Sequence, residues 1–132
     1  MQSTQSSLNP TAAFKHSLFT KKGVFKEGEA AIASDTSFAL RYARDITKKP
    51  FPEGEAAIAL NSFASVSYAK YVLKKRFKEG EIIISQNAKC ALNYARDVIK
   101  GRFPEGEAAI ADDAQCTLEY ERDIIKGHWV RS

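Results

Sequence analysis

Apolar and polar positions recur every 26 residues along most of the chain. The phrase Phe-Pro-Glu-Gly-Glu at 103–107 also stands at 51–55 and, with lysine in place of proline, at 25–29 and 77–81. A tyrosine follows the opening aromatic residue by seventeen positions in each copy. A fixed period of this length is typical of repeat proteins, whose units bury their apolar faces only by stacking on one another.

Each period predicts two short helices joined by about two residues. Glutamates in every copy, and a first-turn proline at 52 and 104, favour the first helix, expected over 26–33, 52–59, 78–85 and 104–111. The second helix carries one apolar stripe and is expected over 36–48, 62–74, 88–100 and 114–126. Its predicted N-caps are Asp35, Asn61, Asn87 and Asp113. Gly101 and Gly127 are the expected C-caps of the last two copies.

These elements predict an all-α fold, a right-handed α-solenoid of about four and a half copies. We expect a disordered lead-in at 1–8 and one domain over 9–132. A half repeat at 9–24 would hold Asn9 as N-cap and a helix over 11–22 that stops at Gly23. The full units are 25–50, 51–76, 77–102 and 103–128, with a terminal segment at 129–132.

Three columns of the period predict the packing between units. Each of Gly28, Gly54, Gly80 and Gly106 costs a helix about 1 kcal/mol relative to alanine, which indicates a neighbour too close for a Cβ. The opening aromatic residues would staple successive layers. We expect the tyrosines to pack with their hydroxyls bonded to a carboxylate or carbonyl, with base stacking as the alternative. Cys90 and Cys116 should be buried and too far apart for a disulfide.

The stretch 94–114 reads YARDVIKGRFPEGEAAIADDA. It resembles short tandem helical repeats of phage, large-virus and bacterial proteins, most of which have no assigned function. The resemblance covers about four-fifths of the chain, and it implies a viral or phage-related source and an interaction role without catalytic residues. The second unit departs from the pattern, because Tyr71 stands where Asp45, Asp97 and Asp123 stand in the others.

No residue set in the sequence specifies a reaction. Glu53 and Glu55 are two positions apart on a helix and point to nearly opposite sides, so they cannot act together as acid and base. His16 and His128 have no metal ligand at suitable spacing, and nucleotide or nucleophile motifs are absent. The acidic last unit is better explained as a solvated end cap than as a cation site. We therefore expect no enzyme activity, no cofactor and no metal.

The net charge of +4 is unevenly distributed, since residues 103–132 carry seven acidic and three basic side chains. Basic residues recur where each second helix ends, a position that the helix dipole favours. Stacking would align them into a ribbon able to follow phosphates, so nucleic-acid binding is the alternative function. Its candidate residues are Lys48, Lys49, Lys74, Lys75, Arg76, Lys100 and Arg102.

The second unit also predicts a protein-binding site, because three columns that are polar in the other copies become apolar together. Leu60, Phe63 and Tyr71 are those substitutions, and Phe63 and Tyr71 lie along one side of the second helix with Ser67 between them. The alternative is that Phe63 replaces Phe38 and turns inward. The candidate site residues are Leu60, Phe63, Ser67, Lys70 and Tyr71.

The expected partner is therefore a protein. By analogy with the resemblance, it is a host enzyme, or a defence or nucleic-acid-processing complex, which the chain would inhibit. A self-assembling structural role is a further alternative, because the basic body and acidic end would permit head-to-tail contact. No run of 18 apolar residues and no signal peptide occur, so we expect no membrane contact and a cytoplasmic location, that of the host cell for a phage protein.

Overall fold

The computed structural model describes residues 9–17 and 28–130, and all regular structure in these ranges is helical. The all-α prediction is therefore confirmed for this part of the chain. The predicted lead-in at 1–8, the end of the predicted helix over 11–22, and Phe25 lie outside the described residues. The α-helices are α1 (Pro10–Ser17), α2 (Glu29–Ala33), α3 (Thr36–Arg41), α4 (Glu55–Ile58), α5 (Ser62–Ser67), α6 (Glu81–Ile84), α7 (Ala88–Tyr94), α8 (Glu107–Ala111) and α9 (Ala114–Tyr120).

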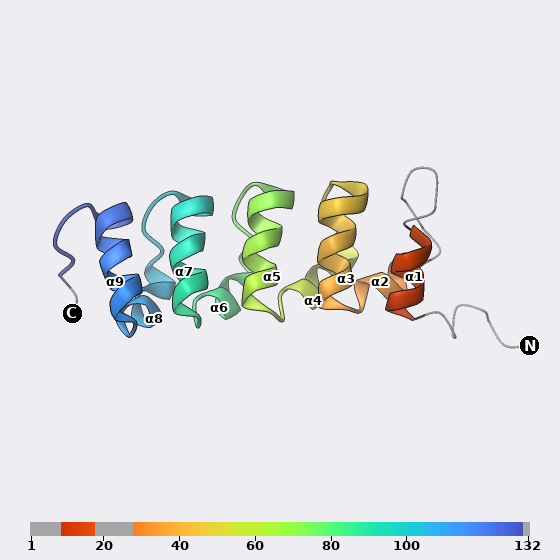
Figure 1. Cartoon of the computed structure of the whole chain (residues 1–132), viewed down its shortest axis with the longest axis horizontal. Coiled ribbons are helices and arrows are strands. Elements are labelled where there is room, and N and C mark those ends of the chain that lie inside the picture. The colour runs from red at the N-terminus through yellow and green to blue at the C-terminus, as the bar shows by residue number, and fades with distance from the viewer. Residues whose placement is uncertain (1–8, 18–27, 131–132) are drawn as a thin grey trace, which may run out of the picture.

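The helices α3, α5, α7 and α9 stand side by side in a row, and α1 continues the row beside α3 (Figure 1). Each contacts the next member of the row. The shorter helices α2, α4, α6 and α8 lie along the lower edge of this row in Figure 1, near the N-terminal ends of the long helices. Because α6 contacts both α5 and α7, and α8 contacts both α7 and α9, the short helices tie neighbouring long ones together.

Side-chain caps begin the longer helices where the sequence predicts them. The carboxylate of Asp35 accepts a hydrogen bond from the Phe38 N–H at 2.9 Å, and Asn61 accepts one from the Ala64 N–H at 2.8 Å. Asn87 and Asp113 cap α7 and α9 in the same way. These caps fix where each second helix starts, and with it the register of the buried positions that follow.

The longer helices end differently from the prediction. Their last turns are π-helical, at η3 (Tyr42–Thr47), η5 (Tyr68–Leu73), η7 (Ala95–Ile99) and η9 (Glu121–Ile125). The Lys100 N–H donates to the Ala95 carbonyl five residues earlier, at 2.7 Å. This wider turn ends the helix one residue early, so Lys100 and Lys126 are the left-handed C-caps, at φ 60° and 62°. The prediction of Gly101 and Gly127 as C-caps is therefore wrong.

The short helices also begin with a tighter turn than predicted. A 3₁₀ turn precedes each of the last three, at η4 (Pro52–Gly54), η6 (Lys78–Gly80) and η8 (Pro104–Gly106). The glycine N–H that closes each turn donates to the carbonyl of the aromatic residue three positions earlier, at 3.0 Å. The tight turn places that aromatic ring against its own glycine, within 2.7 Å of an added Cβ.

Buried tyrosines connect successive 26-residue units. The Tyr68 hydroxyl donates to the Glu55 carboxylate at 2.6 Å and accepts the Phe51 N–H at 2.9 Å, both within its own unit. Its ring packs on Phe77 of the next unit, with centroids 5.0 Å apart. Tyr94 and Tyr120 repeat all three contacts. Tyr42 likewise donates to Glu29 and packs on Phe51. The expectation of packed rings with hydroxyls on carboxylates is confirmed.

The hydroxyls of Tyr68, Tyr94 and Tyr120 stay protonated at neutral pH. Burial, together with the hydrogen bond to Glu107, raises the pKa of Tyr120 to about 12. Burial likewise raises the pKa of Tyr68 and of Tyr94. Each hydroxyl can therefore donate to its glutamate while accepting the backbone N–H.

Glycines in the short helices allow close contact between units, as predicted. A Cβ at Gly80 would lie 2.7 Å from the Cβ of Ser65 and 2.7 Å from the Phe77 ring. A Cβ at Gly106 would lie 2.7 Å from Ala91 in the same way, and one at Gly54 would lie 2.9 Å from Ala39. Each glycine thus faces a small residue of the preceding long helix.

We predict that Gly80→Ala lowers the free energy of unfolding by about 1–3 kcal/mol, because the added methyl overlaps Ser65 and Phe77. Gly127→Ala is the matched control, since a Cβ there would meet nothing within 4 Å. Urea unfolding of both variants measures the difference. Equal effects would contradict the close contact at Gly80.

Candidate protein-interaction site

Ion pairs cross from one long helix to the next on the solvent side. Lys70 pairs with Asp97 at 3.2 Å. Arg96 occupies the same position one unit later and pairs with Asp123 at 3.4 Å and with Glu119 at 3.5 Å. A cation of one unit therefore meets a carboxylate of the following unit, and we call this series the ion-pair ladder.

The ion-pair ladder is interrupted at Tyr71. Asp97 and Asp123 occupy the equivalent positions, but Tyr71 offers no carboxylate to Arg44 of the preceding unit. Arg44 instead donates two hydrogen bonds to its own neighbour Asp45, at 2.9 and 3.0 Å. This pairing raises the pKa of Arg44 and lowers that of Asp45. An uncharged aromatic side chain thus stands in a column of charged ones.

Three large apolar side chains of the second unit are exposed. The exposed fractions are 76% for Leu60, 60% for Phe63 and 54% for Tyr71. Phe38, by contrast, is half-buried and stacks on Phe14 with centroids 5.0 Å apart. The alternative that Phe63 turns inward in place of Phe38 is therefore wrong.

The structure brings four of the five predicted site residues to one groove between α5 and α7. Phe63, Ser67, Lys70 and Tyr71 line this groove, and we call these four residues the aromatic patch. Leu60 precedes the Asn61 cap and is not part of the groove lining. Lys70 lies over the Tyr71 ring, 5.1 Å from its centroid, while its ammonium pairs with Asp97.

A second groove lies on the other side of Phe63, between α3 and α5. It has a volume of about 430 Å³, which falls in the range of ligand clefts. Leu40 and Ala64 supply apolar surface there, and Thr36, Ser37, Asn61 and Ser67 supply polar groups. Phe63 therefore projects between two depressions, the arrangement of an anchor side chain with room for a partner on both sides.

Sequence reasoning missed part of this site. Val66, Cys90, Asn93 and Asp97 also line the groove of the aromatic patch. Asp97 and Asn93 come from the next unit, so they join the patch only through stacking of α7 on α5. A basic residue recurs every 26 positions at 70 and 96, and an acidic residue recurs at the next position, 97 and 123. This pattern could have identified Asp97.

The basic candidates fall into two groups. Lys48, Lys74 and Lys100 are exposed and cap the ends of η3, η5 and η7, which lie along the top edge of Figure 1. The guanidinium of Arg76 instead forms a two-bond pair with Glu81, at 2.7 and 3.0 Å. Arg102 forms the same pair with Glu107, at 2.8 and 2.9 Å. Lys49 and Lys75, which directly follow Lys48 and Lys74 in the chain, are also exposed.

The Arg–Glu pairs shift the titration of the carboxylates. Arg102 lowers the pKa of Glu107. Burial alone would raise the pKa of Glu81, but the hydrogen bonds from Arg76 and Tyr94 outweigh it and lower the pKa. These carboxylates thus remain ionised while they hold the tyrosine hydroxyls.

Other candidate chemistry has a structural use. Glu119 and Asp123, from the acidic last unit, share the Arg96 guanidinium. Cys90 and Cys116 are free and buried, as predicted, and burial raises the pKa of Cys116 to about 11, so its thiol stays protonated at neutral pH. Within residues 9–17 and 28–130, no group of acidic, histidine or cysteine side chains is arranged to hold a metal ion.

Comparison of the chain with protein-family models, with curated proteins and with solved structures found no match. The resemblance to phage and bacterial repeats therefore stays a prediction from the sequence. Among the described helices, none is long and apolar enough to span a membrane.

We predict that Tyr71→Asp keeps or raises the free energy of unfolding, by up to about 1 kcal/mol, because the introduced carboxylate can pair with Arg44 as Asp97 pairs with Lys70. Tyr71→Asn is the uncharged control, and urea unfolding at low salt measures both. A loss of more than about 1 kcal/mol in both variants would show that the Tyr71 ring belongs to the core.

Proposed function

We propose that this chain is a non-enzymatic α-solenoid that binds another protein through the aromatic patch. The row of helices α3, α5, α7 and α9 and the recurrent tyrosine contacts support the repeat architecture. In such an architecture, the repeated residues build the scaffold and the variable outer positions select the partner.

The concentration of exposed apolar side chains in one unit carries this proposal. Six large apolar side chains are exposed in the described part of the chain, and three of them fall within residues 60–71. They are Leu60, Phe63, Tyr71, Ile82, Leu118 and Val130. The exposed aromatic side chains do little to stabilise the packing of one unit on the next. Large aromatic side chains such as tyrosine, however, often supply much of the binding energy of a protein interface.

The charges around the aromatic patch favour a partner with an apolar anchor pocket and an acidic rim. Lys70 is already paired with Asp97, so the centre of the patch carries little net charge. Lys74 and Lys75 are exposed at the adjacent helix end and have no ion pair within the described residues. Acidic groups on the partner would therefore meet these lysines at the edge of the contact.

A host enzyme or defence complex, which the chain would inhibit in the host cytoplasm, is the partner class that the resemblance supports. The nucleic-acid alternative has less support, because Glu81 and Glu107 neutralise Arg76 and Arg102. A continuous ribbon of free cations would need those two side chains to face the phosphates.

We predict that Phe63→Ala combined with Tyr71→Ala weakens partner binding by about 2 kcal/mol or more, while the melting temperature hardly changes. Ile82→Ala is the matched control, since Ile82 is an exposed apolar residue outside the patch. Quantitative pull-down followed by titration of the recovered partner measures the loss. Unchanged binding with a large drop in stability would place both rings in the core and reject the patch.

A further inference from the structure

A cleft beside Pro50 lacks the arginine that the next two units have at the equivalent position. Positions 50, 76 and 102 are equivalent in the 26-residue period, and they hold Pro50, Arg76 and Arg102. Each arginine binds the glutamate five residues later with two hydrogen bonds. Glu55 is the equivalent glutamate after Pro50, and it has no ion pair within the described residues.

The geometry of the occupied sites shows what the Glu55 carboxylate can accept. Arg76 reaches both oxygens of Glu81, and Tyr94 donates to the Oε2 of the same carboxylate at 2.6 Å. At Glu55 the tyrosine contact is retained, because Tyr68 donates to Oε2 at 2.6 Å. The carboxylate is therefore held by Tyr68 as Glu81 is held by Tyr94, but without the guanidinium.

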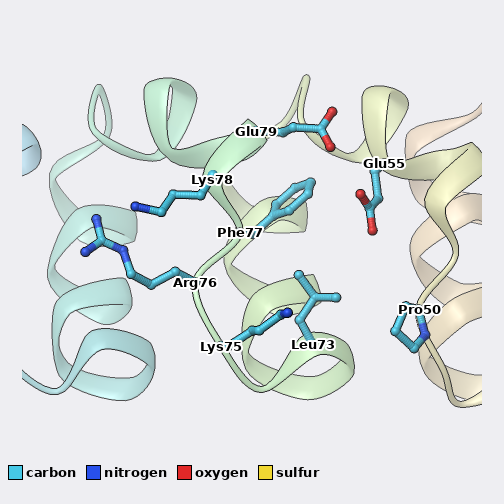
Figure 2. Close-up of a pocket in the computed structure, with 8 residues that line it drawn as sticks. All are labelled: Pro50, Glu55, Leu73, Lys75, Arg76, Phe77, Lys78 and Glu79. Carbon is cyan, nitrogen blue, oxygen red and sulfur yellow. The ribbon is translucent and has the colours of Figure 1, made fainter.

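Open space takes the place of the missing side chain. A cleft of about 530 Å³ is lined by Pro50, Glu55, Leu73, Phe77 and Glu79, together with Lys75, Arg76 and Lys78. Figure 2 shows the Glu79 carboxylate directed toward Glu55, with Phe77 and Leu73 facing the same space. Apolar side chains and two carboxylates together suit a cation on a methylene stem.

A second carboxylate, that of Glu79, lies near Glu55 and makes a cation in the cleft more favourable. Glu79 is exposed, and a hydrogen bond with the Glu55 carboxyl raises the pKa of Glu79. Two carboxyl groups this close repel one another when both are ionised, and a cation between them relieves that repulsion. Of the three basic side chains that line the cleft, Arg76 is bound to Glu81, and Lys78 points away from Glu55 in Figure 2. The third, Lys75, lies beside Leu73 in the same view and forms no ion pair with Glu55 or Glu79 among the described residues.

We propose that this cleft receives an arginine side chain from another protein, which forms with Glu55 the two-bond pair that Arg76 forms with Glu81. The planar guanidinium matches both carboxylate oxygens, whereas a lysine ammonium is a point charge and fits less well. No residue of the aromatic patch lines this cleft, although Lys75 lies at the edge of both sites. The arginine proposal holds whether or not the patch binds a partner.

Binding of a capped arginine, Nα-acetyl-arginine amide, to the full chain tests this site. Titration followed by amide resonances should shift Phe51, Glu55 and Glu79, with capped lysine binding at least about threefold more weakly. Glu55→Gln should weaken the arginine binding at least about fivefold, because the neutral amide keeps the Tyr68 contact but loses the charge. Equal binding of both capped amino acids, or no effect of Glu55→Gln, would overturn the proposal.

Two further variants use the equivalence of positions 50 and 76. Pro50→Arg should supply the guanidinium internally, abolish binding of the capped arginine and raise the melting temperature by about 2 °C or more. The chain already accommodates arginine at the equivalent positions, so this variant should fold. Arg76→Ala should open a second site and add shifts at Glu81.

Retained binding in Pro50→Arg, or no new shifts in Arg76→Ala, would contradict the assignment. Titration with inorganic phosphate tests the alternative that the cleft binds an anion. If phosphate shifts these resonances and capped arginine does not, Lys75 and Lys78 form an anion site and the proposal fails.

Discussion

The hydroxyl of each buried tyrosine is the interaction on which the arrangement of this chain depends. It closes its own 26-residue unit by holding a glutamate and the backbone N–H of the opening aromatic residue, as Tyr94 does with Glu81 and Phe77. The ring then packs on the aromatic residue of the following unit, as Tyr94 does on Phe103. One side chain thus couples hydrogen bonding within a unit to packing between units, and loss of the hydroxyl would leave a buried N–H without a partner.

This coupling separates the positions that must recur from those that are free to vary. The tyrosine, its glutamate and the glycine opposite a small residue are fixed by buried contacts. The outer face of the long helices and the loop before each aromatic residue have no such constraint. Tyr71 can therefore replace a carboxylate of the ion-pair ladder, and Pro50 can stand where the next two units have an arginine. Both proposed interaction sites lie where a contact that the following units make is missing.

The period alone was enough to predict the all-α class, the N-caps of the long helices and the packed tyrosine column, because each rests on local spacing or on a residue type repeated in one place. The C-caps at Gly101 and Gly127 were wrong, since glycine is the usual left-handed residue and nothing in the sequence indicates a π turn that shifts this role to Lys100. The ion-pair ladder and the approach of Glu79 to Glu55 join different units, so they follow only from how the units stack.

Hydrogen exchange at the Phe77 amide tests the central role of the tyrosine hydroxyl most directly. This N–H lies outside the helices and donates only to the Tyr94 hydroxyl, at 2.8 Å. It should exchange as slowly as the amides of the helical core, and Tyr94→Phe should accelerate it at least about tenfold, with a smaller effect at Phe51, which Tyr68 holds. Exchange at Phe77 as fast as at the exposed Lys75 amide in the unmodified chain would contradict the account.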